Sequence, residues 1–132
     1  MPSKGKDYIH RVNGPAVICG DGSIRWYVDG KRHRLDGPAV EYASGTKHWW
    51  VDGKRHRLDG PAVEYASGLD LWYVEGKRHR LDGPAVKYAG GTKKWYVDGE
   101  QLDTEEVEEW LEENKVDLTT EIEQMAFKLR WL

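Results

Sequence analysis

The sequence predicts a mainly β protein, in which tandem 23-residue β-hairpin repeats form an extended antiparallel sheet or an open solenoid capped by two C-terminal α-helices. Three observations predict this fold. Residues 11–102 hold four copies of one unit, each copy contains short β-prone stretches between glycine turns, and residues 103–132 change to a helical composition. Residues 1–10 are then an N-terminal cap or a partial repeat.

The repeat period is constant over all four units. The second and third units, residues 34–56 and 57–79, match at 18 positions and differ at five. A fixed period in the range of about 20 to 50 residues is typical of stacked repeat architectures. The positions that recur every 23 residues include Arg11, Arg34, Arg57 and Arg80; Pro15, Pro38, Pro61 and Pro84; and Trp26, Trp49, Trp72 and Trp95.

Each unit is expected to be a hairpin with a short return. In the second unit, residues 39–42 alternate as a strand, and residues 43–45 read as a turn. Residues 47–51 form the second strand, and residues 52–54 form a tight turn in which glycine supplies the positive φ. Pro38 lacks an N–H and should stand at a strand start. Because a lone hairpin is marginal in water, stacking is needed to bury the apolar side.

Alternation along the second strand predicts a core face and an exposed face. The tryptophan and valine of each unit share the predicted core face: Trp26, Trp49, Trp72 and Trp95 with Val28, Val51, Val74 and Val97. The residues between them predict an exposed aromatic row, which comprises Tyr27, Trp50, Tyr73 and Tyr96. A basic set, Lys31–Arg34 and its copies, runs beside that row and includes Arg32, Arg55 and Arg78.

Such a row can be interpreted in two ways. Aromatic rings flanked by arginine can bind peptide, nucleic acid or anionic ligands. The alternative is that the rings pack cross-strand and the basic side chains only solvate the surface.

The C-terminal segment predicts two capped helices. Asp103 is placed to cap the first helix, with Glu106 three residues on, and Thr120 with Glu123 repeats this pattern after a break at residues 114–118. The apolar stripe of the first helix is Val107, Trp110 and Leu111. The second helix carries Ile122, Met125, Ala126, Leu129 and Leu132, with Phe127 and Trp131 on another side. A terminal helix with two apolar sides either wedges into a core or meets a partner.

Charge is divided unevenly along the chain. The net charge is −3, which argues against a generally basic nucleic-acid binder. Residues 1–100 carry a net charge of +4 and residues 101–132 a net charge of −7. The acidic side chains, among them Glu108, Glu109 and Glu112, are expected on the solvated side of the first helix. They serve either solubility and the helix dipole or contact with a basic partner, such as a nucleic-acid-binding groove of another protein.

Several classes of protein are disfavoured by the sequence. The one cysteine, Cys19, excludes a disulfide framework and a cysteine zinc site, and it is expected to be buried or incidental. The first ten residues have no apolar segment of the signal-peptide kind, and no apolar stretch approaches the length of a transmembrane helix. We therefore expect a cytoplasmic protein.

Catalysis and metal binding are also disfavoured. His10, His33, His56 and His79 recur once per unit, but equivalent residues of adjacent hairpins lie about 9–10 Å apart, too far to share an ion. Asp36, Asp59 and Asp82 each precede Gly-Pro, where an aspartate commonly caps a turn. No nucleophile has a base nearby, so we predict no enzyme, no cofactor and no metal.

The third unit departs from its neighbours at one hairpin tip. It has Leu69 and Leu71 where the second unit has Thr46 and His48. Two leucines on a tip reduce solubility unless they are covered, so they are candidate contact residues.

The repeat resembles a known family. Residues 52–56, followed by Gly60 and then by residues 65–68, resemble a MORN-type repeat, whose units form β-hairpin sheets. The chain departs from that pattern by placing Arg-Leu-Asp-Gly-Pro-Ala after the histidine. It is more similar to the Gly-Pro-Ala-Val repeats of bacteriophage and large-virus proteins. The resemblance implies a scaffold or binding role, with lipid binding in some members.

Our functional hypothesis is a non-enzymatic protein-binding module. With the viral resemblance, it becomes a phage-encoded inhibitor that occludes the surface of a host defence complex, such as a nucleic-acid-guided nuclease, in the host cytoplasm. The alternatives are a structural or anionic-lipid-surface scaffold, and a small-anion sponge that uses Arg32, Arg55 or Arg78. A protein partner is expected, direct nucleic-acid binding is not, and a homodimer is compatible with the two-sided last helix.

Overall fold

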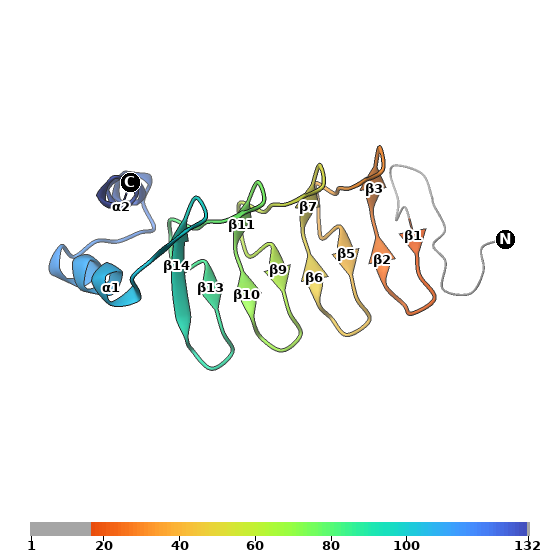
Figure 1. Ribbon diagram of the computed structural model, residues 1–132, viewed down its shortest axis with the longest axis horizontal. Helices are drawn as coiled ribbons and strands as arrows, with labels where there is room; N and C mark the ends of the chain where they lie inside the picture. Colours follow the sequence, from red (N-terminus) through yellow and green to blue (C-terminus); the bar gives the residue numbers. More distant parts are fainter. Residues whose placement is uncertain (1–16, 132) are drawn as a thin grey trace.

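The computed structural model describes residues 17–131 and shows a mainly β chain that ends in two helices. The hairpins stand in a row, and both helices lie at the C-terminal end of that row (Figure 1). The predicted fold class is therefore confirmed. Residues 1–10 and His10, for which a cap and a recurring histidine were predicted, lie outside the described residues, as do Arg11, Pro15 and Leu132.

The main sheet contains nine antiparallel strands. Their order in the sheet is the same as their order along the chain, and the strands missing from this order form separate two-stranded ribbons. The nine strands are β1 (Val17–Ile18), β2 (Ile24–Arg25), β5 (Val40–Glu41), β6 (Lys47–His48), β9 (Val63–Glu64), β10 (Asp70–Leu71), β13 (Val86–Lys87), β14 (Lys93–Val97) and β15 (Glu100–Leu102). Three two-stranded ribbons branch from it. They pair β3 (Tyr27–Val28) with β4 (Lys31–Arg32), β7 (Trp50–Val51) with β8 (Lys54–Arg55), and β11 (Tyr73–Val74) with β12 (Lys77–Arg78).

The return of each repeat is itself a hairpin, which the sequence did not predict. Asp52 and Gly53 have φ of 51° and 76°, and two positive φ values in the central positions are typical of the type I′ turn that matches strand twist. The tryptophan before each ribbon interrupts the strand. Its N–H donates instead to the next repeat, as from Trp49 to the carbonyl of Ala62 at 2.7 Å. A two-residue strand therefore lies on either side of Trp49.

The repeats are joined by the same backbone bonds at each described junction. Between the first and second units, Arg34 N–H donates to the carbonyl of Trp50, and Gly53 N–H donates to the carbonyl of Arg32, both at 3.0 Å. The next junction repeats both bonds 23 residues later. Because each unit bonds mainly to its neighbours, the array grows in one direction.

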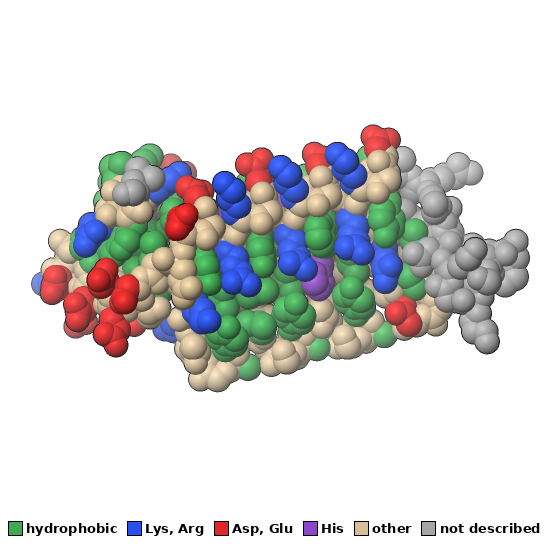
Figure 2. All heavy atoms as spheres, viewed as in Figure 1, with side chains coloured by type: hydrophobic (Ala, Val, Ile, Leu, Met, Phe, Trp, Pro, Cys, Tyr) green, Lys and Arg blue, Asp and Glu red, His purple; other side chains and the backbone are tan. Residues whose placement is uncertain are grey.

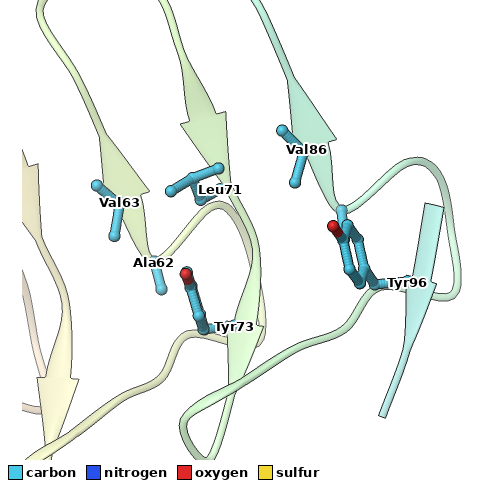
Figure 3. Close-up of a cluster of buried hydrophobic side chains, with 7 residues drawn as sticks. Ala62, Val63, Leu71, Tyr73, Val86 and Tyr96 are labelled. Carbon is cyan, nitrogen blue, oxygen red and sulfur yellow. The ribbon is translucent and has the colours of Figure 1, made fainter. Parts of the chain in front are cut away.

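The core lies on the valine side of the sheet. Val63 pairs with His48 and Leu71, and Leu71 pairs with Val86, so these side chains share one face. Tyr73 and Tyr96 pack in the same buried cluster (Figure 3). The core of the array is thus made by the side opposite to the predicted one.

The prediction that the tryptophans mark the core is wrong for three of the four. Trp26, Trp49 and Trp72 are only half-buried, with Val28, Val51 and Val74, whereas Trp95 and Val97 are buried. The sheet is one layer thick, and a face is buried only where something packs over it. The helices supply that cover only at the last repeat.

The helical cap is formed by α1 (Thr104–Glu113) and α2 (Glu121–Arg130). Both predicted N-caps are confirmed, since Asp103 accepts from Glu106 N–H and Thr120 accepts from Glu123 N–H. Phe127 is completely buried, and its ring lies edge-on to Trp95 at a centroid distance of 5.6 Å. The cap is therefore a small second core at the end of the array.

The second helix has one covered and one open side. Phe127 and Trp131 pack inward, but Ile122, Met125 and Leu129 are 83%, 60% and 62% exposed. We call these three residues the outer stripe of α2. The expectation of a helix wedged into a core therefore holds for one apolar side of α2, and contact of the other side with a partner stays a prediction.

Candidate functional site

The two arginines of each Lys-Arg-His-Arg segment have different surroundings. The second one stacks on the tryptophan of its own hairpin: the Arg57 guanidinium lies 3.9 Å from the Trp49 ring centroid. Its Nε donates to Asp59 at 3.0 Å and its Nη1 to Glu64 at 2.7 Å. Arg34 and Arg80 repeat the stacking and the aspartate bond. This set of arginines is neutralised by carboxylates.

The recurring aspartates were predicted to cap turns, but each of them instead accepts a hydrogen bond from the arginine side chain two residues earlier. Asp36 accepts from Arg34 Nε at 2.9 Å, and Arg34 Nη1 closes the loop by donating to the Pro38 carbonyl at 3.2 Å. Asp59 and Asp82 do the same with Arg57 and Arg80. The hydrogen bond from Arg34 lowers the pKa of Asp36, so this carboxylate stays charged at neutral pH.

The first arginine of each segment lies against the predicted aromatic row. The guanidinium groups of Arg32 and Arg55 each lie 5.2 Å from the Trp50 ring centroid, on a row continued by Arg78 at 5.3 Å from Tyr96. Within residues 17–131, no carboxylate forms an ion pair with any of these three arginines. We call this surface the ladder face; it comprises Tyr27, Trp50, Tyr73, Tyr96, Arg32, Arg55 and Arg78.

The prediction that the aromatic row is exposed is wrong. Tyr73 and Tyr96 are 8% and 9% exposed, and Tyr27 and Trp50 are half-buried. Their rings belong to the core side of the sheet, and the arginines lie over them. The rings of Tyr73 and Tyr96 are therefore closed to a ligand, whereas those of Tyr27 and Trp50 are partly accessible.

The hydrogen bonds of the ladder arginines differ between Arg78 and Arg55. Arg78 donates from Nε to the Tyr73 hydroxyl and from Nη1 to the Tyr96 hydroxyl, both at 3.2 Å, and these bonds raise the pKa of Arg78. Arg55 meets Trp50 at the position equivalent to Tyr73, and an indole offers no acceptor. Arg55 Nε has no hydrogen-bond partner among the described residues. Arg55 thus lacks the tyrosine hydrogen bonds that hold Arg78.

Basic side chains dominate the face seen in Figure 2, and acidic ones gather at the helical end of the molecule. Lys31, Lys54 and Lys77 are exposed beside the ladder arginines. The stem of Lys31 lies over Gly53 of the next turn, where an added Cβ would be 3.6 Å away. The lysines thus alternate with the ribbon turns along the edge of the array.

A histidine that the sequence did not single out lies below the ladder. His48 lies edge-on between Tyr42 and Tyr65, at centroid distances of 5.7 and 5.9 Å. Burial lowers the pKa of His48, with a further contribution from Arg55 and Arg32. The ring is therefore neutral at pH 7. Its signal in the sequence is weak, because the next repeats have Leu71 and Lys94 at that position.

The two leucines of the third repeat do not form a contact surface. Leu71 is buried in the core cluster, which overturns its prediction as a contact residue, and Leu69 is half-buried and packs against that cluster. The reason is the strand register, which places Leu71 opposite Val63 and Val86. Leu71 thus fills the core where the second repeat has His48.

The acidic residues lie on the solvated side of α1, as predicted. Glu108, Glu109 and Glu112 are exposed, and the structure places them at the helical end, away from the ladder (Figure 2).

The repeated histidines hold one repeat to the next. His33, His56 and His79 each accept a hydrogen bond at Nδ1 from the backbone N–H of the following ribbon turn, at 3.0, 2.9 and 2.9 Å. In the part of the chain that is described, no group of three or more His, Cys, Asp and Glu residues could hold a metal ion. Burial lowers the pKa of His79.

The histidines predict an acid-sensitive fold. Because His48 and His79 have a lowered pKa in the folded chain, the unfolded chain takes up protons first as the pH falls. The free energy of unfolding should be constant above pH 7 and decrease as the pH falls below about 6.5. Urea denaturation at pH 8, 6.5 and 5.5 measures this.

The matched variant is His48→Phe combined with His79→Asn. Asparagine keeps an acceptor for Asp98 N–H but does not titrate. The double variant should lose less free energy of unfolding between pH 8 and 5.5 than the wild type does. An equal loss in both proteins would contradict the assignment.

Comparison of this chain with protein-family models, with curated proteins and with solved structures finds no match. The resemblance to MORN-type repeats therefore stays a prediction. Neither helix in the described part of the chain has the length and apolar character needed to cross a membrane.

Proposed function

We propose that this protein is a non-enzymatic protein-binding module whose ladder face docks an acidic segment of a partner protein. The observation that carries the proposal is the contrast between the two arginine sets. Arg34, Arg57 and Arg80 are each held by an aspartate, whereas Arg32, Arg55 and Arg78 have no carboxylate among the described residues. A guanidinium resting on a ring is pre-oriented for a carboxylate.

The spacing of the ladder favours an extended ligand. Equivalent arginines in adjacent repeats are two strands apart, about 9–10 Å. A peptide in the polyproline II conformation advances about 9.3 Å per turn of three residues, so every third side chain lies on the same side. An acidic side chain at every third residue would therefore meet successive arginines, and Arg55 would meet the central one.

The test compares two triple variants with a fluorescent glutamate-rich peptide. Arg32→Gln, Arg55→Gln and Arg78→Gln together should weaken binding about tenfold or more, because each exposed charged pair contributes up to about 1 kcal/mol. Lys31→Gln, Lys54→Gln and Lys77→Gln remove the same charge from the neighbouring turns and should weaken it much less. Fluorescence anisotropy at constant ionic strength gives both dissociation constants.

An equal loss in the two triple variants would show attraction by net charge and would refute a ladder site. Flotation with vesicles that contain an anionic lipid distinguishes the lipid-surface scaffold from the peptide-binding module. If the vesicles bind and the peptide does not, with the same dependence on the ladder arginines, the lipid-surface function replaces the one proposed here.

The more specific hypothesis, an inhibitor of a host defence complex, also remains a proposal. It predicts that the protein retains one host component in a pull-down and that charge reversal at Glu108, Glu109 and Glu112 releases it. These side chains are exposed and available for such a contact. Retention that is unaffected by both the reversal and the ladder variant would contradict this hypothesis.

A further inference from the structure

A groove runs along the side of the array opposite the ladder face. Its first section is a cavity of about 610 Å³ that Trp49 and Val51 line, between the loops of Leu35 and Leu58. Arg57 also lines this section and donates a hydrogen bond to Glu64. Glu64 follows the buried Val63 in one strand, and successive side chains of a strand point to opposite faces, so Glu64 points away from the buried face. The groove and the ladder therefore use different sides of one sheet.

The groove continues into the next repeat. Its second section, about 290 Å³, is lined by Trp72 and Val74, between the loops of Leu58 and Leu81. Leu58 lines both sections, so they are consecutive. We call the two together the indole groove.

The walls of the indole groove combine exposed leucines with the arginine–aspartate pairs that line both sections. Leu35 and Leu58 are 80% and 79% exposed, although each stands in a loop with charged neighbours on both sides. Leucines that are exposed at the same place in successive repeats form an apolar row, and an exposed apolar row is a candidate site of protein contact.

The chain itself shows what covers this kind of surface. In the last repeat, Trp95 and Val97 occupy the positions equivalent to Trp49 and Val51, and both are buried under the helical cap. Leu81, the equivalent of the two exposed leucines, is half-buried against the same cluster. The cover is a helix whose apolar stripe, centred on Phe127, meets the indole.

The outer stripe of α2 is a second helix face of this type and has no cover. From Ile122 to Leu129 the helix rises about 10.5 Å over seven residues. Equivalent positions of adjacent repeats lie about 9–10 Å apart. A helix lying along the array would thus place Ile122 and Leu129 in successive sections of the indole groove.

We propose that two copies of this chain form a homodimer in which the outer stripe of α2 of each copy lies in the indole groove of the other. Gln124 of α2 lines the second section of the groove, so the stripe and the groove lie close together within one copy. A two-fold axis between the copies then forms both contacts at once. The dimer covers the exposed leucines of the groove with the exposed outer stripe of α2.

Two single variants and their mixture test the pairing. Leu58→Glu places a charge in the groove and Leu129→Glu places one in the stripe, and both positions are exposed enough to leave the monomer folded. Each variant alone should be monomeric in sedimentation equilibrium, whereas the wild type is dimeric. Tyr88→Glu, at an exposed tyrosine away from both features, should remain dimeric.

Mixing the two monomeric variants should restore a dimer of lower affinity. The Leu129→Glu copy still offers an intact groove, and the Leu58→Glu copy still offers an intact stripe. Circular dichroism and urea denaturation of each variant confirm that the monomers are folded.

Three outcomes would overturn the proposal. They are a wild type that stays monomeric at the highest attainable concentration, a mixture that stays monomeric, and a Leu58→Glu variant that stays dimeric. The last outcome, with a monomeric Leu129→Glu, would assign the contact to two α2 helices instead. None of these outcomes depends on the ladder face.

Discussion

Replacing Phe127 with alanine should lower the free energy of unfolding by about 3–5 kcal/mol. Phe127 is completely buried, and its ring packs with Trp95, Trp110 and Trp131 at centroid distances between 5.2 and 6.3 Å. No other aromatic ring of the described chain joins both helices to the last repeat in this way. Without it, α2 loses its completely buried side chain, and Trp95 loses the ring that packs edge-on against it.

The measurement is urea denaturation followed by tryptophan fluorescence. Phe127→Leu is the matched control, since it keeps most of the side-chain volume and should cost about 1 kcal/mol. Glu113→Ala, on the exposed end of α1, should change little. A loss below about 1 kcal/mol for Phe127→Ala would mean that the cap does not stabilise the array.

Removing one whole repeat should leave a folded protein, whereas removing one residue fewer should not. Deletion of residues 49–71 takes out 23 residues and joins His48 to Trp72. The deletion leaves β6 without β9 and β13 without β10, and β6 and β13 can then pair with each other. Val86 and Lys87 take the places of Val63 and Glu64, and Lys47 and His48 take the places of Asp70 and Leu71. The array becomes one repeat shorter, with all its faces unchanged.

Deletion of residues 49–70 removes 22 residues and leaves Leu71 as an additional residue before Trp72. Because side chains alternate along a strand, one additional residue turns those that follow it to the wrong face. Urea denaturation should show a cooperative transition with a smaller m-value for the 23-residue deletion. For the 22-residue deletion it should show a broad transition or none. Similar transitions for both deletions would contradict the role of register.

Local features of the fold could be predicted from the sequence. The period, the glycine turns and the two helix caps depend on neighbouring residues only, and Asp103 and Thr120 cap as their spacing indicates. The face of the sheet that forms the core could not be predicted in this way. Alternation identifies two faces of a strand but does not say which face is covered, and Trp49 breaks the strand whose alternation was used.

The two arginine sets illustrate the same limit at the candidate site. Arg32 and Arg34 are two residues apart and would share a face if the strand continued. The strand β4 ends at Arg32, however, and the chain then turns so that Arg34 stacks on Trp26. The repeated Arg-Leu-Asp spacing is the signal that could have indicated the arginine–aspartate pair and the leucine between them.

The sheet is a single layer, with the ladder arginines Arg32, Arg55 and Arg78 on one side and the indole groove on the other. Two copies that met through their indole sides would direct their arginines outward, in opposite directions. One particle could then hold two separate acidic chains at the same time, one on each side. Cross-linking of separate targets, rather than tight capture of one, is the behaviour to expect from such a geometry.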